Sequence, residues 1–183
     1  NALGDIGTVL LTIEDNNEDN EIDCPVFVLN AFGGSNDSPT ESDIVTTIGC
    51  GARGVNFYGG SNNATIGNED NPIDVTLNIN GGVFTNIYGG SKGTFPNPYD
   101  DIPDVEQTVA ADIHGNVTVN YYDGTVERIY GGSHQNGNIY GKITVNVYFD
   151  HDTNCGDGQS VDYVFGGGEM AIYTPNDHTI LYS

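Results

Sequence analysis

Two acidic stretches of the chain place side-chain oxygen atoms at alternate positions, an arrangement that could bind a hard cation. The first spans residues 15–23 and opens Asp-Asn-Asn-Glu-Asp, and the second spans residues 150–157 and opens Asp-His-Asp-Thr-Asn. In calcium loops, side chains at positions 1, 3 and 5 converge on one ion. The predicted calcium ligands are Asp15, Asn17, Asp19, Asp23, Asp150, Asp152 and Asn154.

Neither stretch completes the helix–loop–helix calcium motif. Position 12 is Val26 in the first stretch and Val161 in the second. The motif has a bidentate glutamate at that position. A solvated acidic loop is therefore the alternative interpretation of each stretch, and calcium is the one cofactor that we predict.

A third candidate site lies in the longest interval between repeats, which inserts residues 92–111. This insertion is rich in proline, aromatic and acidic residues, and its candidate ligand-binding residues are Phe95, Tyr99, Asp100 and Asp101. Loops that project from a rigid scaffold often carry recognition. The two aromatic rings could stack on a sugar ring, or they could only hold the loop against the body of the protein.

Two cysteines are spaced like the repeats themselves. Cys24 and Cys50 are 26 residues apart, and each lies eight residues before an aromatic residue, Phe32 or Tyr58. Stacked parallel strands lie about 4.8 Å apart, and a disulfide accepts Cα separations of roughly 4.4–6.8 Å. We therefore predict a Cys24–Cys50 disulfide, which favours an oxidising compartment. Cys155 has no predicted partner.

Charge excludes several classes of partner. The chain has 26 Asp and Glu against 4 Lys and Arg, a net charge of −22. Such a surface repels phosphate, so we expect no nucleic-acid partner. No run approaches the about 18 apolar residues of a membrane span, so we expect no membrane insertion. The charge attracts cations, although solubility alone would also explain it.

The sequence does not favour an enzyme. Its four histidines share no metal-ligand spacing, and no Gly-x-Ser-x-Gly elbow is present. A polysaccharide lyase needs a basic cleft for its acidic substrate, and the few cationic residues form no cluster. Paired carboxylates for glycoside hydrolysis cannot be singled out among so many acidic residues. A polysaccharide lyase or hydrolase remains the minority alternative.

An aromatic-Gly-Gly signature recurs five times and organises the whole chain. Its spacings are 26, 30, 42 and 35 residues. The aromatic positions are Phe32, Tyr58, Tyr88, Tyr130 and Phe165, and Ser follows the glycines in the first four repeats. Asn stands two residues earlier at Asn30, Asn56 and Asn86, which predicts an amide ladder along a stack of repeats.

Upstream of each aromatic residue, apolar and polar residues alternate with the period of a half-buried strand. The inward positions are Val9, Leu11 and Ile13; Ile44, Thr46 and Ile48; Val75, Leu77 and Ile79; Val117, Val119 and Tyr121; and Ile143, Val145 and Val147. A third short stretch recurs at Ile6, Ile66, Ile113 and Ile139. Tight turns are predicted at Gly81-Gly82 and Asp123-Gly124, whereas the two acidic stretches are insertions at the same place.

Stacking in register lets repeats bury the apolar faces that no single repeat can bury. We therefore predict an all-β fold, a right-handed parallel β-helix (β-solenoid) of about five irregular coils. An antiparallel β-sandwich explains the alternation but not the recurring signature. Residues 1–183 are predicted to be one β-solenoid segment of a longer repetitive protein.

Three blocks carry a resemblance: Ile-Tyr-Gly-Gly-Ser, Gly-Asn-Val-Thr-Val-Asn and Ile-Asn-Gly-Gly-Val. Together they resemble the glycine-rich repeat regions of large bacterial surface and secreted proteins, the adhesin-like β-helix proteins. The resemblance covers about residues 6–170. It implies an extracellular or cell-surface scaffold that is not an enzyme, and it brings no catalytic residues.

We therefore expect an extracellular structural or adhesin-like module that calcium stiffens. Its expected partners are a host or microbial surface glycan or protein. A carbohydrate-binding β-helix is one alternative. A self-assembling filament subunit, which associates through the solenoid ends, is another, because an uncovered strand edge promotes association.

Overall fold

The computed structural model describes residues 8–14, 26–95, 108–148 and 158–176. These ranges form eight β-strands and contain no helix, and thus none that could cross a membrane. The strands are β1 (Val9–Ile13), β2 (Val26–Phe32), β3 (Ile44–Ile48), β4 (Ala52–Tyr58), β5 (Val75–Tyr88), β6 (Val117–Tyr130), β7 (Ile143–Val147) and β8 (Ser160–Phe165). The prediction of an all-β fold is confirmed.

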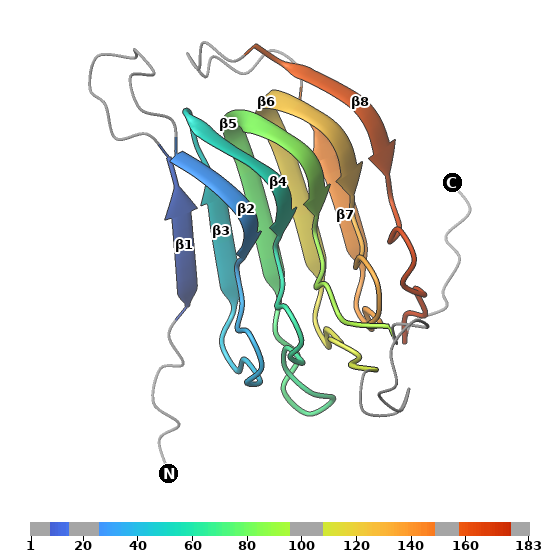
Figure 1. Ribbon diagram of the computed structural model, residues 1–183. Coiled ribbons are helices and arrows are strands. Elements are labelled where there is room, and N and C mark those ends of the chain that lie inside the picture. The colour runs from blue at the N-terminus through green and yellow to red at the C-terminus, as the bar shows by residue number, and fades with distance from the viewer. Residues whose placement is uncertain (1–7, 15–25, 96–107, 149–157, 177–183) are drawn as a thin grey trace, which may run out of the picture.

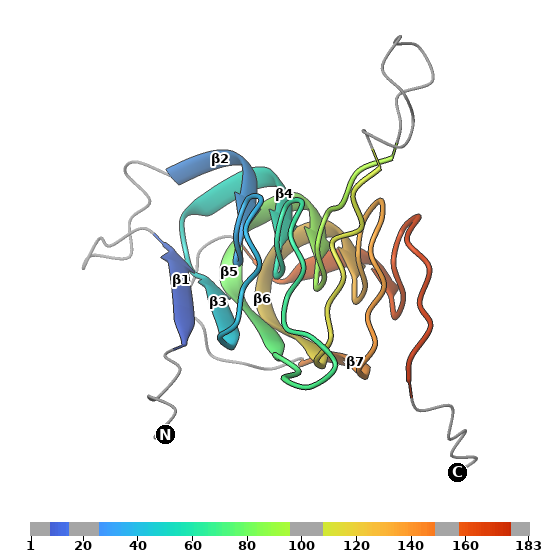
Figure 2. The ribbon, with the colours of Figure 1, turned by 90° about the horizontal axis from the view of Figure 1, so that it is seen from below.

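One curled sheet contains all eight strands, and every pairing between them is parallel. The long strands β5 and β6 hold the sheet together, because each spans both sides of the curl (Figures 1 and 2). Their first halves lie with β1, β3 and β7, and their second halves lie with β2, β4 and β8. Parallel pairing excludes the antiparallel sandwich.

On the first side of the curl, formed by β1, β3, β7 and the first halves of β5 and β6, the strands pair in the register that the sequence predicts. Equivalent residues pair without a break over five positions, from Val9↔Ile44↔Val75 through Val117↔Ile143. The alternating apolar positions of β3, β5 and β6 are buried. The later ones form the main core with Phe57, Phe84, Ile87, Val126 and Ile129, and the first of each strand, Ile44, Val75 and Val117, belongs to a second core cluster. The half-buried strand pattern in the sequence is therefore confirmed.

On the second side of the curl, formed by β2, β4, β8 and the second halves of β5 and β6, the five aromatic residues of the signature stack on one another. Phe32, Tyr58, Tyr88, Tyr130 and Phe165 are paired in register. Successive ring centroids are 4.7, 4.9, 5.0 and 4.9 Å apart, with nearly parallel planes. Tyr58, Tyr88 and Tyr130 form a buried cluster of their own, separate from the main core.

The Gly-Gly-Ser that follows the first four signature aromatic residues has a steric and a hydrogen-bonding cause. A Cβ atom on Gly33, Gly59 or Gly89 would lie 2.3–2.4 Å from the carbonyl oxygen of the equivalent glycine in the next repeat. The serine hydroxyl accepts the backbone N–H of the preceding repeat's serine. These bonds are Ser35 N–H to Ser61 at 3.1 Å, Ser61 N–H to Ser91 at 3.0 Å and Ser91 N–H to Ser133 at 3.3 Å.

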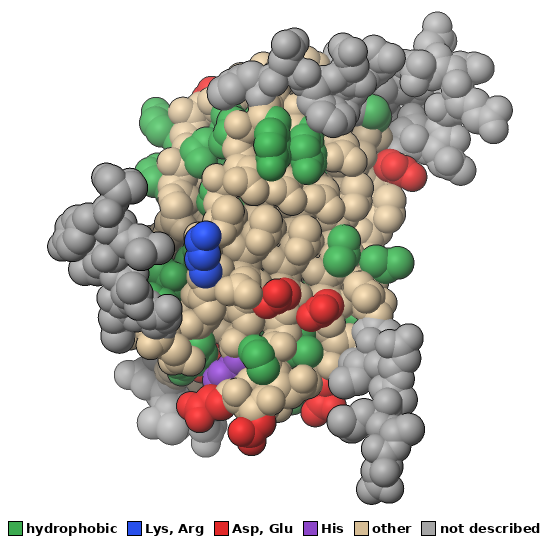
Figure 3. Space-filling model, turned by 180° about the vertical axis from the view of Figure 1, so that it is seen from behind, with side chains coloured by type: hydrophobic (Ala, Val, Ile, Leu, Met, Phe, Trp, Pro, Cys, Tyr) green, Lys and Arg blue, Asp and Glu red, His purple; other side chains and the backbone are tan. Residues whose placement is uncertain are grey.

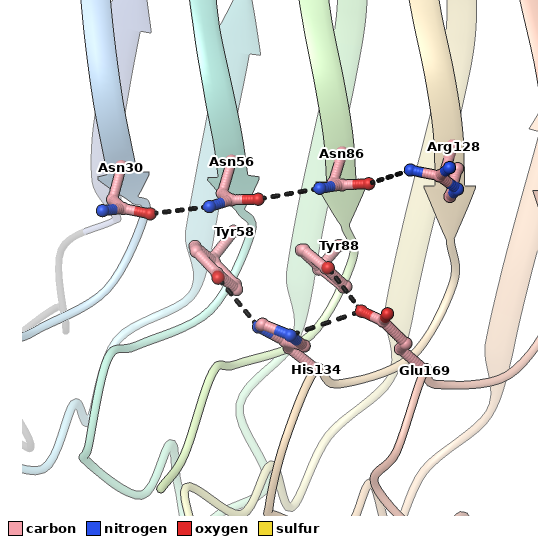
Figure 4. A network of polar contacts seen from close by, with 8 residues as sticks. All are labelled: Asn30, Asn56, Tyr58, Asn86, Tyr88, Arg128, His134 and Glu169. Carbon is pink, nitrogen blue, oxygen red and sulfur yellow. Dashed lines mark hydrogen bonds and ion pairs between the residues drawn. The ribbon is translucent and has the colours of Figure 1, made fainter.

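The amide ladder is confirmed along the same strands. The Asn56 amide donates to Asn30 Oδ1 at 2.9 Å, and the Asn86 amide donates to Asn56 Oδ1 at 3.0 Å. Arg128 occupies the next position and donates to Asn86 Oδ1 at 3.4 Å (Figure 4). Such stacked amides satisfy each other along the sheet, as in other cross-β structures.

The third short stretch forms isolated parallel bridges rather than a named strand. Thr40, Ile66, Ile113 and Ile139 are bridged in succession, and the three isoleucines are buried in a second core cluster. Thr40 was not predicted to belong to this row, because a polar residue there breaks the apolar pattern. Its hydroxyl is hydrogen-bonded to that of Ser35 at 2.9 Å.

The predicted turns at Gly81-Gly82 and Asp123-Gly124 are bends within continuous strands, so the prediction of separate strands there was wrong. Gly82 and Gly124 have positive φ values of 91° and 107°, which glycine adopts at little cost. The pairing of β5 with β6 shifts register at this point, as in a β-bulge. A bulge bends the sheet without ending its hydrogen-bond ladder.

We predict that Gly89→Ala destabilises the fold by about 1–3 kcal/mol, because an added methyl group overpacks a closed contact. Its Cβ would lie 2.4 Å from the Gly131 carbonyl oxygen and 2.6 Å from Val119 Cγ2. The matched control is Gly166→Ala, whose Cβ meets nothing within 4 Å. Urea unfolding measures both, and we expect the control to change stability by less than about 0.5 kcal/mol. Equal losses in the two variants would contradict the close-approach explanation.

Candidate functional site

A cluster of histidine, glutamate and tyrosine side chains lies beside the aromatic stack. His134 and Glu169 each stand four residues after a signature aromatic residue, on the loops that follow β6 and β8. The His134 backbone is fixed by a hydrogen bond from its N–H to the Ser91 carbonyl at 2.9 Å. The imidazole stacks on the rings of Tyr88 and Tyr58, with centroids 4.5 and 5.9 Å away.

Hydrogen bonds join the four side chains into one network (Figure 4). The Tyr58 hydroxyl lies 2.9 Å from His134 Nδ1, and His134 Nε2 lies 3.3 Å from Glu169 Oε2. The Tyr88 hydroxyl donates to the same Glu169 oxygen at 2.6 Å. The network therefore connects residues from four successive repeats.

The protonation states follow from these contacts. A carboxylate at Glu169 can only accept, so Nε2 of His134 carries the proton and Nδ1 accepts from Tyr58. Burial lowers the pKa of His134, with Glu169 opposing and Lys92 adding to this shift. Burial, with a smaller effect of Glu169, raises the pKa values of Tyr58 and Tyr88. The network is thus a neutral imidazole and two protonated phenols around one carboxylate.

A histidine beside a carboxylate is also the arrangement of a general base. Here, however, both ring nitrogens of His134 have partners inside the network, and its ring faces the tyrosine stack. Only 17% of its side chain is exposed. The geometry therefore favours a polar cross-link between repeats over proton transfer to a substrate.

Most of the site residues predicted from sequence lie outside the described ranges, and their roles stay predictions. These are the calcium ligands Asp15, Asn17, Asp19, Asp23, Asp150, Asp152 and Asn154, together with Cys24, Tyr99, Asp100 and Asp101. Cys50 is disulfide-bonded, whereas its predicted pairing with Cys24 remains a prediction. Across residues 8–14, 26–95, 108–148 and 158–176, no group of three His, Cys, Asp or Glu side chains could hold a metal ion.

Phe95 is the one predicted ligand-loop residue that the structure describes. Its side chain is 46% exposed. The preceding residue, Thr94, forms an antiparallel bridge with Val109 through hydrogen bonds of 2.9 and 3.1 Å. This bridge fixes the stem from which Phe95 projects.

Sequence reasoning missed the His134–Glu169 network, although a positional signal was available. The fourth residue after each signature aromatic is Asn36, Asn62, Lys92, His134 or Glu169. Backbone hydrogen bonds from Asn62, Lys92, His134 and Glu169 to the serine one repeat earlier show that this column is aligned. A column of polar residues that changes from Asn to His and Glu could have marked the site.

A second surface, on the outer side of β3, β5, β6 and β7, carries rows of uncharged polar residues. Its rows are Thr76, Thr118 and Thr144, and Asn78, Asn120 and Asn146. The Asn120 and Asn146 amides donate to the preceding asparagine at 2.9 and 2.8 Å. Figure 3 shows this face with a band of uncharged residues, below which acidic side chains lie near the centre and along the lower edge.

Comparison with known proteins adds no relative. No family model, curated protein or solved structure matches the chain. The function is therefore argued from the contacts and charges of the described residues.

We predict that Tyr88→Phe costs about 1–2 kcal/mol of stability, because it removes a hydrogen bond to a carboxylate while keeping the stacked ring. Tyr130→Phe is the matched control: Tyr130 occupies the next position of the stack, and its hydroxyl makes no hydrogen bond to the described residues. Thermal and urea unfolding should show a loss for Tyr88→Phe only. A similar loss in both would show that the network contributes nothing.

We also predict a pH dependence that comes from His134. Because burial lowers its pKa in the folded state, the unfolded chain binds this proton first as the pH falls. The free energy of unfolding should therefore decrease below about pH 6.5, the usual histidine pKa. Urea midpoints at about pH 7.5 and about pH 5.5 should differ less for His134→Gln than for the wild type. An unchanged difference would contradict the assigned role.

Proposed function

We propose that the chain forms a right-handed parallel β-solenoid of about five irregular coils and serves as an extracellular, adhesin-like structural module. The observation that carries this proposal is the aromatic row, which is unbroken from Phe32 to Phe165. Each repeat pairs with the next along its length, and parallel connections are right-handed in nearly all proteins. Such a stack is a stiff rod, suited to presenting a surface.

The side-chain ladders support a structural role. Aromatic, asparagine and serine positions each bond or stack with their own equivalents in neighbouring repeats. Among the described residues, both ring nitrogens of His134 contact side chains of other repeats, Tyr58 and Glu169. Residues that could act on a substrate are used here to join repeats.

Two observations support an extracellular location. Cys50 is disulfide-bonded, and disulfides persist mainly in oxidising compartments. The net charge of −22 keeps a rod soluble and apart from anionic surfaces unless cations are present. Both features agree with the adhesin-like resemblance of the repeats.

Calcium is proposed as the ion that stiffens the module. The two acidic stretches, residues 15–23 and 150–157, fall between β1 and β2 and between β7 and β8. Strands β5 and β6 run continuously through the equivalent place. The two acidic stretches thus lie in repeats that have an insertion between their two strands, and a bound cation would join the flanking strands.

Self-assembly through the strand edges is the second candidate function. Phe27 and Leu29 on β2 are 66% and 63% exposed, and Tyr163 on β8 is 56% exposed. Exposed apolar edge strands promote association between chains. Sedimentation over a range of concentrations tests this candidate, because a filament subunit would form polymers and an adhesin module would remain monomeric.

We predict that fluorescently labelled chain binds saturably to cell surfaces or immobilised surface glycoproteins in the presence of calcium. A chelator should weaken binding and lower the melting temperature, because metal binding to the folded state stabilises it. An unrelated protein of similar size and negative charge is the control. Absence of binding to every surface would refute the adhesin-like role, and turnover of a polysaccharide would establish the enzymatic alternative.

A further inference from the structure

A pocket of about 450 Å³ lies where the loop after β6 meets the segment after β8. It combines apolar and polar side chains at the surface of the rod. The residues that line it include Phe95, Asp112, Asn136, Tyr140, Met170 and Ile172. A pocket with an apolar wall and a few convergent polar groups is the usual form of a small-ligand site.

The apolar part of the pocket is exposed but held in place. Phe95, Met170 and Ile172 are 46%, 52% and 77% exposed. The Thr94–Val109 bridge holds the stem of Phe95, and the Met170 N–H donates to the His134 carbonyl at 2.9 Å. Tyr140 is also held, because its ring stacks on His114 with centroids 4.6 Å apart. Clustered, exposed apolar groups of this kind mark interaction sites.

The polar part of the pocket has unused hydrogen-bond acceptors. Asp112 Oδ1 accepts the Asn138 N–H at 2.7 Å, which leaves Oδ2 without a donor among the described residues. Asn136 donates its amide to the Thr94 carbonyl at 3.3 Å, and its Oδ1 likewise has no donor there. Both side chains are half-buried and oriented by these bonds. They therefore present acceptors that suit a ligand rich in donors.

The segment after β8 is tied to the loop between β6 and β7. Asn138 and Thr174 exchange two hydrogen bonds, from the Thr174 N–H at 2.7 Å and from the Asn138 amide at 2.9 Å. The pocket is thus formed before any ligand arrives, which lowers the entropic cost of binding.

We propose that this pocket binds a neutral pyranose unit of a glycan. A pyranose has an apolar C–H face for Phe95 and hydroxyl donors for Asp112 and Asn136. The net charge of −22 and the Asp112 carboxylate disfavour uronic acids and sulfated sugars. The proposal rests on the adhesin-like function and names the ligand of that function.

The test is a titration of the full chain with methyl β-glucopyranoside, methyl β-galactopyranoside and methyl α-mannopyranoside. Binding is measured by saturation-transfer NMR. At least one should bind saturably, and methyl glucuronide should bind at least tenfold more weakly. Phe95→Ala and Asp112→Asn should each weaken binding at least tenfold. Asp112→Asn keeps the acceptor for the Asn138 N–H, so the fold is retained. The matched control Phe27→Ala removes an exposed phenylalanine on β2 and should leave binding unchanged.

Three results would overturn the proposal: no binding of any neutral glycoside, binding that survives both pocket substitutions, or capture of a lysine-rich peptide in place of sugars. The surface-binding assay separates this failure from failure of the adhesin-like function. If Phe95→Ala adheres as well as the wild type, the pocket assignment fails while the function stands. If sugars bind the pocket but the chain adheres to no surface, the pocket stands and the function fails.

Discussion

The spacing between parallel strands is the constraint on which the rest of this structure depends. Each repeat must pair its backbone with the next at about 4.8 Å, so every side chain meets its own equivalent at that distance. Aromatic rings accept this spacing as a continuous stack, with centroids 4.7–5.0 Å apart. The two glycines after each of the first four rings are required because a Cβ atom would meet the backbone or a side chain of the next repeat. The aromatic-Gly-Gly signature thus follows from the packing of neighbouring repeats at this spacing.

Polar side chains meet the same constraint in a different way. An amide both donates and accepts, so Asn30, Asn56 and Asn86 satisfy one another at 2.9 and 3.0 Å. A carboxylate only accepts, and identical carboxylates would repel in such a row. Asp74 shows one solution, because its Oδ1 accepts the backbone N–H of Asn116 at 2.7 Å. Glu169 shows the other, because a tyrosine and a histidine from earlier repeats donate to it.

The sequence predicted the parts of the fold that depend on equal offsets from the aromatic residue. The inward rows of β3, β5 and β6, the aromatic stack and the Asn30–Asn86 ladder all follow from in-register pairing, and all are confirmed. The bends in β5 and β6 could not be told from turns, because glycine with positive φ serves both. The aligned column marks the position of His134 but not its partners, because His134 contacts Tyr58 and Tyr88 from earlier repeats rather than Tyr130, the aromatic residue of its own repeat. Aligning the repeats identifies equivalent positions. Contacts between side chains at non-equivalent positions depend on side-chain rotamers, which an alignment does not give.

Recognition is then expected where the repeat varies, because the invariant positions are already occupied by contacts between repeats. Position four after the aromatic residue changes from Asn62 to His134 to Glu169, and the loops at this position border the pocket. Phe95 lies in the longest insertion, residues 92–111, and Asp112 lies next to Ile113, a buried residue of the third row. The regular rows fix the backbone on both sides of the pocket. The irregular residues can therefore diverge from one coil to the next without loss of the ladder that holds them.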